Sequence, residues 1–440
     1  HLIIAPLAGR DAWWQSGLAG VIPSTIAFAL AAVFLFAAAR RAFASAAAGF
    51  AALGLFALNP NLLYLQATPM TEPLMLVCLM VLVYAAVRFS QTQSTGAVVL
   101  AALAALAGTL TRYDGWFPIP LAALFFVAAS KRRRVLHAAL FASIASLGPI
   151  YWLAHNWWMY GNALEFYNGP YSAMAIYRRS LAGGMTRYPG DHNWREALYY
   201  YGVAARCVAG WPLAVLGALG AVVSLWKRVV WPLLLLGLVP IFYILSLYSS
   251  GTPIFVPHLW PYAHYNTRYA VVVLPLAAFA AAALVALAPR RMRAWAALAV
   301  VALGTSNWLI NRHADDWLCW KEAQVNSAGR RAAFDQAAAF LRANYRPGSG
   351  LILTFSDLAD VARRAGIPYR EVLHEDNPVF WHAATARPDL FLREPWAVTN
   401  SGDRIATAIV RASRRGPRYD CVRMIAEKGA PVIEIQKRRP

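Results

Sequence analysis

The chain has 440 residues, of which 59% are hydrophobic and 14% charged, and its formal net charge is +20. Its mean hydropathy of +0.43 excludes an ordinary soluble protein, because apolar runs of about 20 residues are what a bilayer core requires. The basic excess argues against a nucleic-acid partner, since much of it lies in short loops between apolar runs, where it sets membrane topology.

The chain divides into a long apolar part and a polar tail. Ten apolar segments have the length and composition of membrane-spanning helices. They are residues 20–39, 42–58, 70–88, 96–111, 114–130, 134–156, 204–226, 229–249, 269–288 and 294–311. This pattern predicts an α-helical polytopic membrane protein with about ten transmembrane helices and a C-terminal soluble α/β domain. We expect residues 1–19 to end an outward loop, 20–311 to form the transmembrane domain and 312–440 the soluble domain.

The charges of the loops predict which side of the membrane each loop faces. The loops after the first, third, fifth, seventh and ninth segments carry 12 Lys and Arg residues and no Asp or Glu. The positive-inside rule makes these loops cytoplasmic and every other connection extracytoplasmic. All six acidic residues of the first 310 fall on the outward side, which favours a polar outward site. Ordinary solvation of loops is the alternative, and it explains Glu72 and Asp114 less well than the others.

The stretch from Leu58 to Pro73 joins two apolar segments and ends in Thr71-Glu72-Pro73. A carboxylate at the mouth of an apolar segment needs water, a cation or a substrate. Glu72 is therefore a candidate catalytic or metal-binding residue. The alternative is a helix start, in which Thr71 caps, Pro73 occupies the first turn and the helix dipole favours the acid.

A tight outward hairpin joins the fourth and fifth segments through Arg112, Tyr113 and Asp114. It brings a guanidinium, a phenol and a carboxylate to the membrane surface. We expect Asp114 to take part in catalysis and Arg112 and Tyr113 to bind substrate. The alternative is that the two charged side chains pair with each other and with lipid headgroups.

The longest outward loop, residues 157–203, carries Arg178 and Arg187. Both are candidate substrate-binding residues, although arginines of surface loops often bind anionic lipid instead. Amphipathic helices lying on the membrane surface are expected in this loop.

The loop at 250–268 is rich in His, Tyr and Trp and ends in Arg268. A guanidinium at a polar mouth suits a phosphate or diphosphate, so His258, His264 and Arg268 are candidate substrate ligands. The alternative is an aromatic belt with incidental cations. The spacing of the two histidines is not diagnostic of a metal site, but His264 is kept beside Glu72 as a candidate metal ligand.

The polar tail alternates between strand and helix patterns, which predicts a small α/β domain. Helices are expected at 327–344, from Ser356 to Arg364 and near 403–413. Strands are expected at 351–355, 370–374, 396–399, 420–426 and 431–436. The sequence contains no glycine-rich phosphate loop, hydrolase elbow or zinc-binding helix motif.

Three motifs in this order resemble the GT-C superfamily of integral-membrane glycosyltransferases, and most closely its bacterial protein-mannosyltransferase-like and aminoarabinose-transferase-like branch. The first is Leu58-Asn59-Pro60 followed by Thr71-Glu72-Pro73-Leu74. The second is Leu110-Thr111-Arg112-Tyr113-Asp114-Gly115-Trp116. The third is Tyr265-Asn266-Thr267-Arg268-Tyr269 with Pro275. The outward soluble tail is also common in the superfamily.

The resemblance implies transfer of a sugar from a polyprenyl-phosphate donor to a glycan, lipid or protein acceptor, usually with inversion. It implies a multi-pass protein of the bacterial inner membrane, with the C-terminal domain extracytoplasmic. Glu72 matches the family's second acidic site, and Arg268, with Tyr269 beside it, a contact to the carrier phosphate. Some members add a divalent cation such as Mg or Mn.

The resemblance also implies a principal general base in the first outward loop, just after the first helix. Most of that loop is expected upstream of His1, and Asp11 is the one carboxylate left in the part present. Two other functions stay open. A transporter or flippase of a lipid-linked or anionic substrate would place polar groups near the bilayer midplane, often with inverted repeats. A structural subunit would lack the upstream base.

Overall fold

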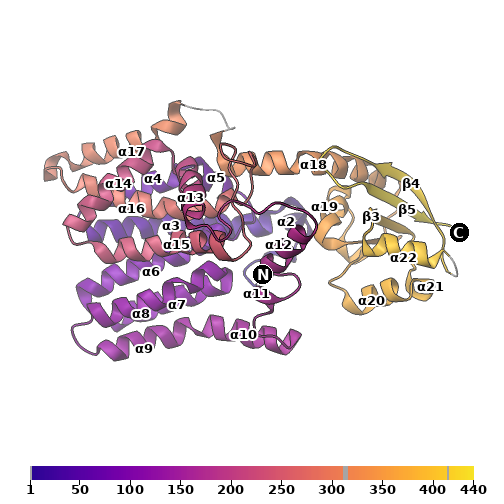
Figure 1. Cartoon of the computed structure of the whole chain (residues 1–440), viewed down its shortest axis with the longest axis horizontal. Helices are drawn as coiled ribbons and strands as arrows, with labels where there is room; N and C mark the ends of the chain where they lie inside the picture. The colour runs from indigo at the N-terminus through magenta and orange to yellow at the C-terminus, as the bar shows by residue number, and fades with distance from the viewer. Residues whose placement is uncertain (1, 311–315, 414–415) are drawn as a thin grey trace. The chain divides into compact units, whose positions relative to one another are not determined.

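The computed structural model describes residues 2–310, 316–413 and 416–440. It separates into two compact units. Residues 19–322 form a helical unit, called the bundle below. Residues 5–18 and 323–440 form a mixed unit, called the C-terminal unit (Figure 1). The N-terminal segment 5–18, predicted to be the end of a membrane-domain loop, thus packs with the polar tail.

The bundle consists of apolar helices joined by short connections (Figure 1). Its longer helices are α3 (Leu18–Ala42), α4 (Ala46–Ala57), α6 (Glu72–Thr92), α7 (Thr95–Thr111), α8 (Pro118–Ala129), α9 (Arg134–Ala145), α10 (Leu147–Tyr160), α13 (Trp194–Ala209), α14 (Trp211–Trp226), α15 (Val230–Ser249), α16 (Val273–Val285) and α17 (Arg293–Ile310). Its shorter elements are α5 (Pro60–Gln66), α11 (Glu165–Asn168), α12 (Ala173–Ala182), η1 (Tyr113–Trp116), η2 (Thr267–Val272) and η3 (Arg290–Met292).

The bundle supports a multi-pass membrane protein. Among the residues described, six helices are long and apolar enough to cross a membrane, or up to eight if each of two bent pairs is one span. Two shorter apolar helices, Thr95–Thr111 and Tyr113–Ala129, coincide with two further predicted segments. The number of ten transmembrane helices stays a prediction.

Two backbone features cause the bends. Between α4 and α5 the chain turns by 69°, where the side chain of Asn59 caps the new helix and Pro60 begins it. Proline lacks the N–H that a continuous helix needs, so it favours a fresh start. Between α13 and α14 the turn is 108°, and Gly210 there has a φ of 76°, a conformation that glycine adopts without strain.

The C-terminal unit is built on a five-stranded mixed sheet in the order β2-β1-β3-β5-β4. The strands are β1 (Leu351–Leu353), β2 (Val372–Leu373), β3 (Trp396–Asn400), β4 (Tyr419–Ile425) and β5 (Ile433–Arg438). β1 pairs parallel with β2 and β3, whereas β5 pairs antiparallel with β3 and β4. All five strands fall on segments predicted from the sequence.

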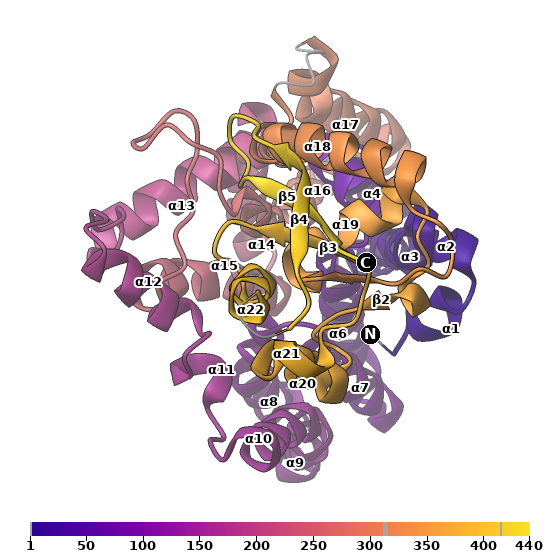
Figure 2. The same ribbon diagram turned by 90° about the vertical axis from the view of Figure 1, so that its right-hand side faces the viewer.

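Helices cover both faces of this sheet (Figure 2). Alternate strand residues point to opposite faces. Leu351 and Leu353 pack with α18 (Leu318–Asn344) and α19 (Phe355–Ala365). Ile352 packs with α20 (Pro378–Ala386) and α22 (Arg404–Ala412), beside the short α21 (Pro388–Phe391). The result is a three-layer α/β/α unit.

The N-terminal segment packs on α19 and the adjoining η5 (Tyr369–Glu371) through α2 (Asp11–Ser16), which follows the short α1 (Ala5–Ala8). The rings of Trp14 and Tyr369 lie 4.4 Å apart. Arg363 donates to the carbonyl oxygen of Gln15 at 2.6 Å. These contacts explain why the segment groups with the polar tail rather than with the bundle.

Candidate functional site

Six side chains from four separate segments of the bundle meet in one cluster, called the Glu72 cluster below. All but Tyr243, which lies within α15, come from or near the start or end of a helix. The members are Glu72, Arg112, Asp114, Tyr243, Arg268 and Tyr269. Four of them are charged, and their formal charges cancel.

Glu72 is the first residue of α6, and only 3% of its side chain is exposed. Its Oε1 accepts a hydrogen bond from Arg112 Nη1 at 3.0 Å and lies 3.4 Å from Arg268 Nε. Its Oε2 is buried and has no hydrogen-bond partner among the described residues. An unpaired buried carboxylate oxygen costs free energy unless a ligand or water satisfies it, so this atom points to a missing partner.

Arg112 holds the cluster together. Its Nε donates to Asp114 Oδ1 at 3.2 Å, and its Nη2 donates to the Tyr243 hydroxyl at 2.8 Å. Its Nη1 donates to Thr71 Oγ1 at 2.9 Å as well as to Glu72. Burial disfavours the charge of Arg112, but the neighbouring Tyr243, Asp114 and Glu72 oxygens more than offset this and raise the pKa of the guanidinium. Arg112 is therefore a permanent cation.

This geometry decides between the functional and the structural alternatives for two motifs. Thr71 does not cap α6 with its side chain, because its hydroxyl accepts from Arg112 instead. The helix-start alternative is thus right about the position, since α6 begins after Thr71 with Glu72 and Pro73 in its first turn, but it is wrong about a capping hydrogen bond from the Thr71 side chain. Arg112 and Asp114 do pair with each other, as the second alternative proposed, but both also reach residues far away in the sequence.

The second carboxylate oxygen of Asp114 accepts a hydrogen bond from a residue of α15. The Tyr243 hydroxyl donates to Asp114 Oδ2 at 2.7 Å while it accepts from Arg112. The rings of Tyr243 and Tyr269 stack with centroids 4.8 Å apart. The guanidinium groups of Arg112 and Arg268 both lie over the Tyr269 ring, at 5.4 and 5.5 Å. Cation–π contact of this kind stabilises two nearby positive charges.

The hairpin that carries Arg112 and Asp114 depends on a glycine. A Cβ atom on Gly115 would lie 2.6 Å from the backbone carbonyl of Gly108 in α7, so no larger residue fits without a shift. Trp116 Nε1 donates to the carbonyl oxygen of Thr109 at 3.1 Å and ties the same turn to α7. The close approach of Gly115 to Gly108 keeps Asp114 near the end of α7, where it pairs with Arg112.

Arg268 is the most exposed of the four charged members of the cluster, with 34% of its side chain exposed. It lies in η2, whose first turn is capped by Glu322 of α18. The Glu322 carboxylate accepts the backbone N–H of Asn266 at 2.9 Å and of Thr267 at 2.8 Å, together with the Thr267 hydroxyl. Asn266 has a φ of 55°, which asparagine tolerates better than most residues.

The carboxylates of the cluster are already paired with cations of the protein. Two guanidinium groups already neutralise the carboxylates of Glu72 and Asp114. Among the residues described, no three His, Cys, Asp or Glu side chains are grouped as metal ligands. Glu72 and His264, the predicted metal ligands, are not part of such a group in the described part of the chain, and a metal role for them stays a prediction.

The two predicted histidines have other surroundings. His258 Nδ1 lies 3.9 Å from the Cys207 sulfur. His264 is half-buried near Glu322 and Lys321 of α18, and burial lowers its pKa. Burial therefore disfavours the charged form of His264, and its substrate-binding role stays a prediction.

The remaining predicted residues lie around the cluster or apart from it. Tyr113 accepts a hydrogen bond from Trp152 Nε1 at 3.1 Å and turns its ring to Phe166 rather than to Glu72. Arg178 is exposed on α12, and Arg187 is exposed with its Nε 3.9 Å from Asp191 Oδ2. These two match the surface-loop alternative.

Asp11 belongs to the C-terminal unit, where its carboxylate is exposed and lies 3.6 Å from Arg370. The contact between the rings of Trp14 and Tyr369 packs this segment against the C-terminal unit. The surroundings of Asp11 therefore give no support to its predicted catalytic role.

Three contributors were not predicted from the sequence. Tyr243 lies inside an apolar segment, where a tyrosine looks like a lipid-facing or core residue. Glu322 lies beyond the predicted end of the transmembrane domain. Tyr201 of α13 is buried near Asp114, and its hydroxyl has no partner among the described residues. No local sequence pattern distinguishes these three residues from their neighbours.

A comparison with known families supports the resemblance seen in the motifs. Residues 14–158 match the family model described as dolichyl-phosphate-mannose-protein mannosyltransferase. The matched region contains Glu72, Arg112 and Asp114 but neither Tyr243 nor Arg268. No curated protein matches the chain. The family match supports a membrane glycosyltransferase of the GT-C type that uses a polyprenyl-phosphate sugar.

Proposed function

We propose that the chain transfers a sugar from a polyprenyl-phosphate carrier to a hydroxyl group of a glycan, lipid or protein, with inversion at the anomeric carbon. The reaction takes place on the extracytoplasmic face of the bacterial inner membrane. The similarity of residues 14–158 to a mannosyltransferase family supports the reaction class. The Glu72 cluster supplies the residues for it.

One observation carries the proposal. A buried carboxylate has one oxygen, Glu72 Oε1, fixed by two guanidinium groups, and the other, Oε2, without a partner among the described residues. A purely structural ion pair has no reason to leave a buried oxygen unsatisfied. A substrate hydroxyl bound at Oε2 would satisfy it.

The chemistry follows from these positions. In place of the upstream carboxylate that the resemblance implies as principal base, Glu72 Oε2 accepts the proton of the acceptor hydroxyl while the hydroxyl oxygen forms a bond to the anomeric carbon. The bond from that carbon to the carrier phosphate oxygen breaks, and its electron pair leaves with the polyprenyl phosphate. Arg268, the more exposed guanidinium, stabilises this leaving phosphate, as preorganised cations do where charge develops. Arg112 keeps Glu72 and Asp114 in place.

The ends of the helices support the proposed side of the membrane. The cluster is built from the start of α6, the end of α7 and the start of η2. Basic residues lie at the opposite ends of the same elements, among them Arg88 near the end of α6 and Arg290 after α16. The positive-inside rule assigns those ends to the cytoplasm.

Replacement of Glu72 by glutamine tests the proposal, because it keeps the shape and removes the charge and the proton acceptor. The membrane fraction of cells that express the full-length protein, or not, is analysed by mass spectrometry for a glycosylated product. E72Q should lose at least about tenfold in product formation. The matched control is E196Q, which changes another acid in the first turn of a helix, α13.

If E72Q formed the product at the wild-type rate, Glu72 would not be the proton acceptor of the reaction. Movement of an unchanged lipid-linked sugar across the membrane, without a new glycosidic bond, would replace the transferase by a transporter.

A further inference from the structure

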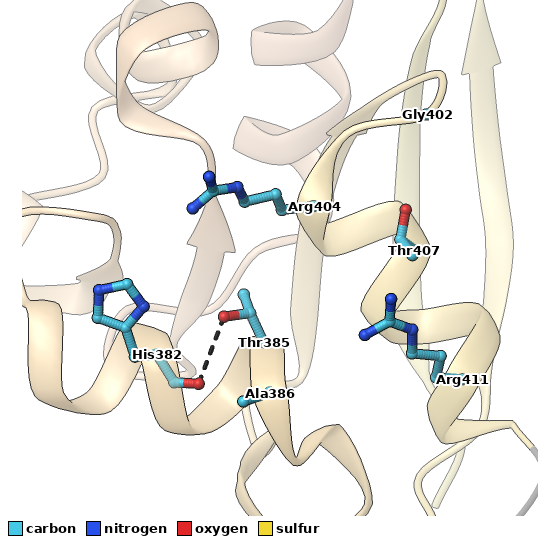
Figure 3. A pocket seen from close by; sticks show the side chains of 7 residues that line it. All are labelled: His382, Thr385, Ala386, Gly402, Arg404, Thr407 and Arg411. Carbon is cyan, nitrogen blue, oxygen red and sulfur yellow. Dashed lines mark hydrogen bonds between the residues drawn. The ribbon is translucent and has the colours of Figure 1, made fainter. Parts of the chain in front are cut away.

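The C-terminal unit contains a hollow of about 340 Å³ between α20 and α22. Its walls are formed by His382, Thr385 and Ala386 of α20 together with Gly402, Arg404, Thr407 and Arg411 of or beside α22 (Figure 3). It lies in a different unit from the Glu72 cluster and outside the residues that match the mannosyltransferase family. Neither the Glu72 cluster nor the family match therefore assigns it a role.

Two arginines border this hollow from the same side of one helix. Arg404 and Arg411 are seven residues apart with Thr407 between them, and this spacing puts all three on one face of α22. Figure 3 shows both guanidinium groups leaning from α22 toward α20, which carries His382. Unpaired arginines occur elsewhere on this unit, but these two line one concave surface.

Neighbouring acids do not neutralise these arginines. Within residues 316–413 and 416–440, neither Arg404 nor Arg411 forms an ion pair with an acid. The nearest acid in the sequence is Asp403, which caps α22. Its carboxylate accepts the backbone N–H of Ala406 at 2.7 Å and of Asn400 at 3.0 Å. The unit as a whole also has an excess of positive charge, with 19 Lys and Arg against 12 Asp and Glu in residues 323–440.

Two exposed valines lie on the helices that border the hollow. Val379 of α20 is 75% exposed and lies one turn before His382, and Val410 of α22 is 67% exposed and lies one turn after Thr407. A phosphate with an attached apolar chain would meet cations in the hollow and exposed aliphatic side chains on the same two helices. A free inorganic phosphate would use the cations alone.

We propose that this hollow binds a phosphate group through Arg404 and Arg411. Guanidinium groups bind phosphate oxygens in bidentate geometry more effectively than any other side chain, and the volume is near the lower end for small-molecule sites. Because α18 joins this unit to a membrane bundle, lipid phosphates are present at high effective concentration. The phosphate comes either from an anionic lipid headgroup or from solution.

Hydrogen–deuterium exchange of the full-length protein in nanodiscs separates these sources. One sample contains only phosphatidylcholine, a second contains added phosphatidylglycerol, and a third contains phosphatidylcholine with inorganic phosphate at matched ionic strength. Slower exchange in residues 378–412 with phosphatidylglycerol assigns the site to a lipid headgroup. Slower exchange with inorganic phosphate assigns it to a soluble phosphate.

The double variant R404Q/R411Q should lose this slowing, while R423Q, which changes an exposed arginine of β4, should keep it. Unchanged exchange of α22 without phosphate in the double variant shows that the helix is still folded. Equal exchange in all three samples would overturn the proposal. So would slowing that persists in the double variant, or slowing that sodium chloride alone reproduces.

Discussion

The carboxylate of Glu322 accepts the backbone N–H of Thr267 at 2.8 Å, one residue before Arg268. Glu322 lies on α18, a single helix that begins in the bundle and continues into the C-terminal unit. The helix that leads to the polar tail thus fixes the turn that carries the proposed phosphate ligand.

We expect E322A to misplace Arg268. Loss of the acceptor for two N–H groups costs about 1–3 kcal/mol, and the loosened turn should raise KM for the lipid-linked donor more than it lowers kcat. E322Q keeps one carbonyl oxygen and should recover part of the loss. Steady-state kinetics with a polyprenyl-phosphate sugar measure both values. E427A, in the C-terminal unit, is the control, and an unchanged KM in E322A would show that Glu322 does not position Arg268.

Removal of the Tyr243 hydroxyl should weaken the cluster. In Y243F, Arg112 Nη2 and Asp114 Oδ2 each lose a buried hydrogen bond, which costs about 1–3 kcal/mol. Both thermal unfolding of the purified protein and sugar transfer should report the change. Y248F is the matched control, because Tyr248 lies on the same helix and its contact with Trp194 is made by the ring, which phenylalanine keeps. Equal unfolding temperatures of the two variants would contradict this prediction.

The hairpin should not tolerate a side chain at position 115. G115A places a methyl group against the backbone of Gly108, and overpacking of this kind costs about 1–3 kcal/mol. The displaced Asp114 should also reduce transfer. G202A is the control, since no atom lies within 4 Å of a Cβ at that position. Wild-type stability and activity of G115A would mean that the hairpin shifts freely.

The stability of the C-terminal unit should fall in acid through Glu375. Its carboxylate accepts the backbone N–H groups of Phe355 at 2.6 Å and Ser356 at 3.0 Å, at the start of α19. Burial alone would raise the pKa of Glu375, but these hydrogen bonds lower it below its ordinary value. A lowered folded-state pKa gives stability that is complete above about pH 4.3 and is lost as the pH falls through the folded pKa.

Hydrogen exchange of the α19 peptides between pH 7 and pH 3, corrected for the intrinsic rate, measures this loss. E375Q should flatten the pH dependence of α19 in the acidic part of that range. E427Q should leave it as in the wild-type protein. An identical acid profile in E375Q would assign the loss to other carboxylates.

The charged members of the cluster could be predicted from their position at the ends of apolar segments, and not from their spacing in the sequence. Glu72, Arg112, Asp114 and Arg268 all lie at predicted outward ends of apolar segments, and the structure brings all four together. Tyr243 was missed because hydropathy does not distinguish a tyrosine that faces the interior from one that faces lipid. Its partner Asp114 is 129 residues away, and no local pattern records that contact.

The strands and helices of the polar tail were predictable for a related reason. Each strand of the sheet is short and bounded by turn residues, and its helices have strongly amphipathic sequences, as Arg404–Ala412 illustrates. The docking of the N-terminal segment was not predictable, because it depends on contacts between residues more than 300 positions apart, such as Trp14 with Tyr369 and Gln15 with Arg363. The predicted segment 42–58 ends just before the bend at Asn59, whereas the bend at Gly210 was missed because the predicted apolar segment 204–226 runs through it.

That docking constrains the path of the chain in the membrane. Residues 5–18 and 323–440 fold into one unit, so both must lie on the same side of the bilayer. The number of membrane crossings between Leu18 and Ala323 is therefore even. An insertion or deletion of a single crossing would separate the two halves of this unit by the thickness of the membrane and leave the exposed face of Tyr369 without Trp14.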